Sequence, residues 1–107
     1  MELVLEGNKE TLQIRVIGEL IADTCSDLRE MVMDASARQP KAVLLDMSET
    51  PFLDTSGLGV LVGLRQHLRH QGTVLSLVNP SPKVLDVLRM TRLLKVFGLG
   101  DNSHYPS

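Results

Sequence analysis

The segment from residue 42 to residue 57 constrains the fold of this chain more than any other. It opens with an unbroken apolar run, Ala-Val-Leu-Leu, which is closed by Asp46. Such a run is typical of a strand buried on both faces, as in a parallel sheet covered by its crossovers. A loop containing Pro51 follows, and a helical pattern begins after the Asp-Thr-Ser-Gly sequence at residues 54–57. The segment therefore predicts a strand–loop–helix unit.

Hydrophobic periodicity predicts the elements on either side of this unit. Alternating apolar residues at 3–5 and 11–17, separated by a polar turn, indicate an N-terminal hairpin. Helical spacing begins near residue 24, where Thr24 and Asp27 resemble a capping box, and it stops before Pro40. An apolar run at 74–78 predicts a further buried strand. Beyond it, Ser81 as a cap with Pro82 at the first helical position predicts a third helix, and either a short strand or a helical turn follows at 94–97.

The predicted fold class is α/β, with element order β-β-α-β-α-β-α and a mixed, mostly parallel sheet of four to five strands. Helices between successive strands impose parallel pairing through right-handed crossovers, whereas the N-terminal hairpin adds an antiparallel edge. We expect one domain over residues 1–100 and a flexible tail over residues 101–107. Functional groups in such sheets gather where strands end and helices begin, which here places Asp46 near residues 54–56.

The start of the central helix has the chemistry of an anion site. Asp54 is well placed as an N-cap, since its carboxylate can accept the N–H groups of Ser56 and Gly57. Ser56 then lies in the first turn, among N–H groups without intrahelical partners at the positive end of the helix dipole. A phosphate on or near Ser56 would be stabilised there.

The same helix carries two glycines on the side opposite its apolar stripe. The stripe consists of Val60, Leu61, Leu64 and Leu68. Gly59 and Gly63 each weaken a helix by about 0.8–1 kcal/mol relative to alanine, so their presence on an outward face requires a reason. Leu58 and Val62 flank them. Either another part of the chain packs on this face or a partner protein docks there, and we favour the partner.

Composition and charge exclude several classes of function. A net charge of −2 without a local basic stripe argues against nucleic-acid binding. No apolar run approaches the length of a membrane span. The chain begins Met-Glu and enters a strand pattern at once, so we expect no signal peptide. The single cysteine, Cys25, suits the reducing cytoplasm and is expected to be a small buried side chain on a helix.

The sequence does not predict an enzyme, a metal site or a cofactor site. Gly-x-Ser-x-Gly is absent, because Asp54 lies two residues before Ser56. His67 and His70 lie several helical turns beyond Ser56, too far to activate its hydroxyl. The carboxylates at this edge lack clustered His or Cys companions for a metal. The glycines after Ser56 lack the third glycine of a dinucleotide fingerprint.

Residues 44–48 (Leu-Leu-Asp-Met-Ser) and 52–60 (Phe-Leu-Asp-Thr-Ser-Gly-Leu-Gly-Val) resemble the STAS domains of bacterial anti-sigma factor antagonists. The likeness extends upstream to Gly-Glu-Leu at 18–20 and Thr24, and downstream through Ser81-Pro82 to Leu94. The fold of that family agrees with the element order derived above. The resemblance implies that Ser56 is phosphorylated by a serine kinase that is also the anti-sigma factor. The unphosphorylated form would bind that kinase and free the sigma factor.

The resemblance and the pattern of the central helix together predict a set of site residues and partners. The phosphorylation loop comprises Asp46, Asp54, Thr55, Ser56 and Gly57, and the partner surface comprises Asp23, Leu58, Gly59, Val62 and Gly63. A phosphatase would reverse the modification, and the protein would be a cytoplasmic monomer or weak dimer. The chain departs from the family at Ile21, where relatives usually carry Asp. An unmodified scaffold subunit, for example on the ATPase of an ABC transporter, and a nucleotide-binding module are the alternatives.

Overall fold

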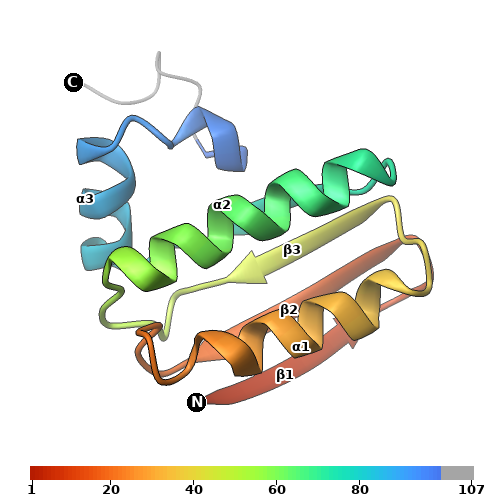
Figure 1. Cartoon of the computed structure of the whole chain (residues 1–107), viewed down its shortest axis with the longest axis horizontal. Helices are drawn as coiled ribbons and strands as arrows, with labels where there is room; N and C mark the ends of the chain where they lie inside the picture. The colour runs from red at the N-terminus through yellow and green to blue at the C-terminus, as the bar shows by residue number, and fades with distance from the viewer. Residues whose placement is uncertain (100–107) are drawn as a thin grey trace.

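The protein, seen here in a computed structural model, is described over residues 1–99 (Figure 1). The predicted tail at 101–107, with His104, lies outside the described residues. The strands are β1 (Glu2–Gly7), β2 (Thr11–Ile17), β3 (Ala42–Asp46) and β4 (Val74–Val78); the helices are α1 (Cys25–Ser36), α2 (Thr55–His70) and α3 (Pro82–Met90), followed by the 3₁₀ helix η1 (Lys95–Phe97). The predicted order is confirmed, and the undecided element at 94–97 is a helical turn.

The four strands form one mixed sheet in the order β1-β2-β3-β4. β1 pairs antiparallel with β2, and the pairings of β2 with β3 and of β3 with β4 are parallel. The register aligns Ile14 with Leu45 and Leu45 with Leu77, so buried side chains meet across the sheet. α1 and α2 run side by side in the same direction across one face, and their N-termini lie together (Figure 1). This arrangement confirms the mixed α/β sheet with an antiparallel edge hairpin.

The hydrophobic core lies between the sheet and these two helices. Val43 and Leu45 of β3 are fully buried, whereas Leu44 between them is only half-buried. β4 alternates in the same way, with Leu75 and Leu77 buried and Ser76 half-buried. The expectation that β3 is buried on both faces is therefore wrong, and β4, which was expected to be buried, is also buried on one face only. Alternate side chains point to opposite faces, and α1 and α2 cover only one of them.

Three helix starts were predicted from capping chemistry; those of α2 and α3 have a side-chain cap bond, and that of α1 does not. Ser81 caps α3 as predicted: its hydroxyl oxygen accepts the Val84 N–H, and a proline follows at the first helical position. Thr24 precedes α1 but makes no side-chain cap bond. Its hydroxyl instead accepts the Ile21 N–H and donates to the Glu19 carbonyl, 2.7 Å away. The capping box is therefore wrong, because the hydroxyl is engaged in the turn before the helix.

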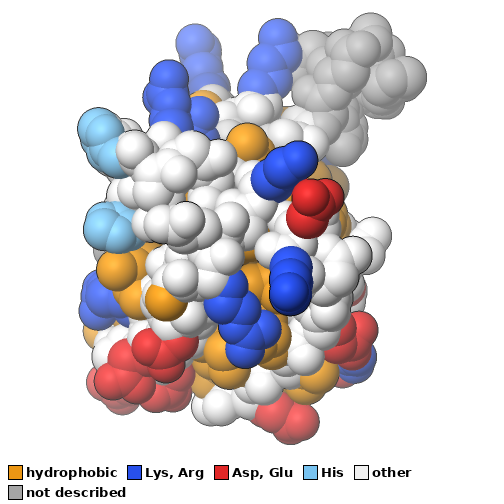
Figure 2. All heavy atoms as spheres, turned by 90° about the vertical axis from the view of Figure 1, so that its right-hand side faces the viewer, with side chains coloured by type: hydrophobic (Ala, Val, Ile, Leu, Met, Phe, Trp, Pro, Cys, Tyr) orange, Lys and Arg blue, Asp and Glu red, His pale blue; other side chains and the backbone are white. Residues whose placement is uncertain are grey.

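The last turn of α2 is basic. It carries the histidines His67 and His70 and also Arg69, whose charge complements the negative end of the helix dipole. Figure 2 views this end of the molecule and shows basic and histidine side chains over its upper part, with acidic side chains gathered below. Both signs of charge share this face, so it carries no continuous basic stripe. None of the helices within residues 1–99 combines the length and the apolar character needed to cross a membrane.

Candidate functional site

The start of α2 is held in place by the segment that follows β2. The Leu20 N–H donates to the Phe52 carbonyl, and the Leu20 carbonyl accepts the Asp54 N–H. Leu20 and Leu53 form a short parallel bridge, and both are buried. Gly57 is also buried and packs directly on the Leu20 backbone, leaving no room for a Cβ. Two segments distant in sequence therefore fix the position of the first helical turn.

Asp54 caps α2, and Ser56 follows within the first turn. The Asp54 carboxylate accepts the Gly57 N–H at 2.9 Å, as predicted. The expected second bond, from the Ser56 N–H, is not formed. Ser56 is the second residue of α2 and is exposed, as is Thr55 before it. The first N–H groups of a helix have no intrahelical partner, so the Ser56 side chain sits at an exposed, electropositive helix terminus.

A groove between α1 and α2 connects Ser56 with the two glycines. Its lining consists of Arg29, Met33, Ser56, Gly59, Val60, Gly63, Leu64 and His67. A Cβ at Gly59 or Gly63 would meet no atom within 4 Å. Within residues 1–99, therefore, nothing packs over these glycines. The suggestion that another part of the chain covers this face does not hold for the described residues. The glycines instead keep the groove open beside Ser56.

The other predicted surface residues are not gathered at this groove. Leu58 is half-buried and packs against the core, whereas Val62 is 39% exposed. Neither side chain lines the groove. Asp23 is exposed in the turn before α1. The predicted face is thus divided, with its glycines on the α1 side of α2.

Two lining residues, Arg29 and Met33, were not predicted. They are four residues apart on α1, so they share one helix face, and Met33 is 37% exposed. The sequence signal was present in their i, i+4 spacing, which lies outside the buried stripe of Leu28 and Val32. What the sequence lacked was the side of α2 against which this face lies.

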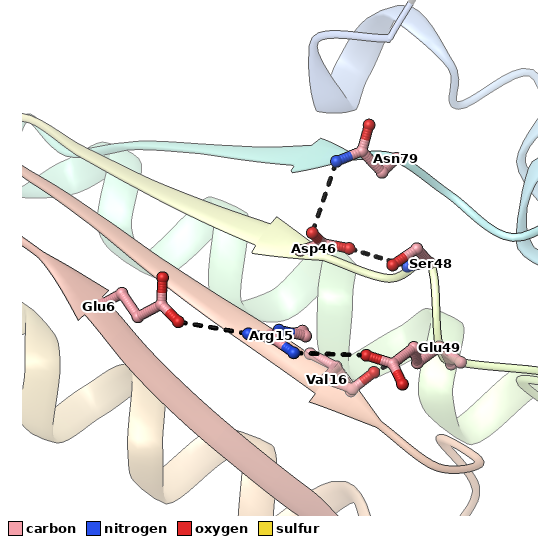
Figure 3. Close-up of polar contacts among 8 residues, drawn as sticks. Glu6, Arg15, Val16, Asp46, Ser48, Glu49 and Asn79 are labelled. Carbon is pink, nitrogen blue, oxygen red and sulfur yellow. Dashed lines mark hydrogen bonds and ion pairs between the residues drawn. The ribbon is translucent and has the colours of Figure 1, made fainter.

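Asp46 lies away from the groove, on the open face of the sheet (Figure 3). Its carboxylate accepts the Ser48 N–H at 2.9 Å and a longer bond, 3.4 Å, from the Asn79 amide. Burial raises the pKa of the Asp46 carboxyl, but these bonds, one with the Ser48 hydroxyl and the charge of Arg15 together hold it below its usual value. Asp46 therefore remains ionised and ties the end of β3 to the segment after β4.

Cys25 is the first residue of α1. Its side chain is buried, with 6% exposed. Burial, and then the charge of Asp54, raise the pKa of the Cys25 thiol, and the charge of Arg29 partly offsets them. The thiol is thus protonated near neutral pH and poorly suited to act as a nucleophile. This agrees with the expected role as a small buried side chain.

Neither histidine of residues 1–99 is placed to activate the Ser56 hydroxyl. His67 lines the same groove but is eleven residues further along α2, roughly 16 Å at 1.5 Å per residue. Within residues 1–99 no three His, Cys, Asp or Glu side chains are grouped as metal ligands would be. What the geometry provides is an exposed hydroxyl at a helix N-terminus, at one end of an open groove.

Comparisons with known proteins agree on one family. The STAS domain profile matches residues 2–105. An anti-sigma F factor antagonist from Paenibacillus polymyxa is 31% identical over 104 residues, covering 95% of this chain and 88% of that protein. The crystal structure of an anti-sigma factor antagonist from Mycobacterium paratuberculosis superposes with a TM-score of 0.80 at 24% identity, covering 99% of this chain and 86% of that one. The phosphorylated form of the Bacillus cell fate determinant SpoIIAA gives 0.71 at 24% identity, covering 95% and 94%.

Proposed function

The chain belongs to the STAS domain family, and we propose that it is an anti-sigma factor antagonist whose binding state is set by phosphorylation of Ser56. The observation that carries the proposal is the position of Ser56, exposed in the first turn of α2 and at one end of a groove. A relative that covers nearly the whole chain bears the name of an anti-sigma F factor antagonist. A protein of the same fold has been solved in a phosphorylated form.

In the proposed cycle the unphosphorylated protein binds a serine kinase that is also an anti-sigma factor. Binding occupies the kinase and frees its sigma factor. The kinase then transfers the γ-phosphoryl group of ATP to the Ser56 hydroxyl oxygen: the bond from the γ-phosphorus to the bridging oxygen breaks, and ADP and the hydroxyl proton are released. The phosphorylated protein dissociates, and a phosphatase restores it by hydrolysis. All of these steps take place in the cytoplasm.

The groove supplies the docking surface in this proposal. Gly59 and Gly63 present bare helix backbone, so a side chain of the partner can approach α2 more closely there than over any larger residue. Ser56 lines the same groove, whereas the neighbouring Thr55 does not. A partner seated over the glycines would therefore reach the Ser56 hydroxyl first. This supports Ser56, and not Thr55, as the phosphoryl acceptor.

Phosphate is expected on Ser56 when the protein is incubated with ATP and its kinase. The kinase can be identified by pull-down from the source organism and mass spectrometry, and the protein that we expect to recover is a histidine-kinase-like ATPase. Peptide mapping of the labelled protein then locates the phosphate, and Ser56→Ala serves as the control that should take up none. Label on Thr55 alone, or no label from a kinase that binds, would refute the phosphorylation switch and favour an unmodified scaffold.

Gly63→Gln is expected to weaken kinase binding at least tenfold without loss of stability. The glutamine side chain would fill the groove, while its better helix propensity should leave the free energy of unfolding unchanged or raise it by up to about 1 kcal/mol. Calorimetric titration and urea unfolding measure the two effects. Met90→Gln, on an α3 side chain that is 83% exposed, is the matched surface control. Identical binding curves for both variants and the wild type would exclude the groove as the docking surface.

A further inference from the structure

Arg29 is exposed and lines the groove that contains Ser56. α1 and α2 begin at the same end of the domain and run in the same direction (Figure 1), so residues one turn into α1 lie beside the first turn of α2. Arg29 is one turn beyond Cys25, the first residue of α1, and it lines the groove together with Ser56. The charges of both Arg29 and Asp54 act on the Cys25 thiol. The guanidinium is thus near the capped end of α2.

Among the described residues, Arg29 forms no ion pair with a carboxylate. The ion pairs within residues 1–99 are formed by Arg15, Lys41 and Arg89, and none of them involves Arg29. No Asp or Glu is among the residues that line the groove. An arginine in a groove without an acidic partner can accept an anion without first breaking an existing pair.

We infer that Arg29 binds the phosphate on phosphorylated Ser56, so that the modified protein holds this phosphate within the groove between α1 and α2. The inference rests on the proposed function, because it needs phosphoserine at this position. A guanidinium presents two parallel N–H donors that match two phosphate oxygens, and the free N–H groups at the start of α2 supply further donors. Arg29 also offsets the repulsion between the phosphate and the nearby Asp54 carboxylate.

This contact explains how one modification can close the whole groove. A phosphate turned toward Arg29 lies across the approach to Gly59, where the proposed partner docks. A partner would have to break the ion pair and also strip water from two charged groups, which is costly without replacement contacts. The phosphate therefore blocks the groove from within the domain, in addition to repelling acidic groups on the partner.

The test measures the second ionisation of phosphoserine installed at position 56 by genetic encoding, which needs no kinase. Phosphorus NMR during a pH titration reports the pKa of that step, ordinarily about 6. The charged groups that flank it are Arg29 from α1 and Asp54 at the N-cap of α2, and the titratable side chain of His67 lies further along α2. A cation stabilises the dianion, so the wild-type value should lie about 0.5 unit or more below that of Arg29→Gln.

Matched variants separate this contact from a general effect of charge. Arg38→Gln removes an equal charge from the other end of α1 and should leave the phosphoserine pKa unchanged. Arg29→Lys keeps the charge without the fork of donors and should recover part of the difference. Circular dichroism checks that each variant is folded. The same phosphoserine pKa in wild type and Arg29→Gln would overturn the inference even if the kinase assay succeeds. A failed kinase assay would overturn the proposed function and leave this result standing.

Discussion

Gly57→Ala is expected to destabilise the domain by about 3 kcal/mol, the upper range for forcing an extra carbon into a packed site. The new Cβ would overlap the Leu20 carbonyl oxygen and would also lie 3.0 Å from the Leu20 Cγ. That carbonyl accepts the Asp54 N–H, so it cannot move away without breaking a bond that holds the N-cap. Urea unfolding followed by circular dichroism measures the loss. A domain of this size should melt more than ten degrees lower.

The other glycines of α2 provide the matched controls for this substitution. Gly59→Ala and Gly63→Ala place the same methyl group where no atom lies within 4 Å. Each should raise the free energy of unfolding by as much as about 1 kcal/mol, because alanine is the better helix former. The three variants share one chemical change, the addition of a methyl group. The expected change in the free energy of unfolding differs in sign because their surroundings differ. Equal stabilities for all three would show that Leu20 does not fix the start of α2.

The features that the sequence predicted correctly depend on neighbours in the chain. Asp54 caps α2 because the Gly57 N–H is three residues away, and Ser81 caps α3 in the same manner. The buried stripe of α2 follows from its periodicity alone. The direction of strand pairing needed one further rule, that a crossover helix between two strands makes them parallel. This rule also depends only on which elements follow one another along the chain.

The features that were missed or wrong depend on what a residue meets in space. Thr24 has good capping chemistry, but its hydroxyl is taken by the turn at Glu19 and Ile21. Leu44 belongs to an apolar run, yet α1 and α2 cover only the opposite face of the sheet. Asp46 was expected near Ser56 because both follow β3. Its alternation with Leu45 places the carboxylate on the open face instead.

The same distinction separates the two halves of the candidate site. Ser56 and the glycines were predicted because a helix start and two weak helix formers are visible in sequence. Arg29 could not be assigned to the site, because helical periodicity does not state which exposed face of α1 lies against α2. The groove exists only through that packing. For a functional surface built from two helices, the sequence can therefore indicate the residues that one helix contributes. It does not indicate which residues of the other helix face them.

Ser56→Asp is expected to abolish most kinase binding while leaving the domain folded. The carboxylate would sit at the N-terminus of α2, where the dipole stabilises a negative charge by about 0.3–1 kcal/mol, and repulsion from Asp54 is of similar size. The two effects nearly cancel, so the melting temperature should stay within a few degrees of the wild type. A docked partner would bury the charge, and an unpaired buried charge costs several kcal/mol. Affinity should therefore fall by about a hundredfold or more.

Thr55→Asp is the matched control, because it adds the same charge to the same helical turn outside the groove. Thr55 is exposed and does not line the groove, so the added carboxylate stays in water when the partner docks. Its affinity should remain within about threefold of the wild type, as expected for a screened charge at the rim of an interface. Circular dichroism, thermal melting and calorimetric titration on the three proteins separate folding from binding. An unfolded Ser56→Asp, or a folded one that binds as well as Thr55→Asp, would show that the phosphate does not act by blocking the groove.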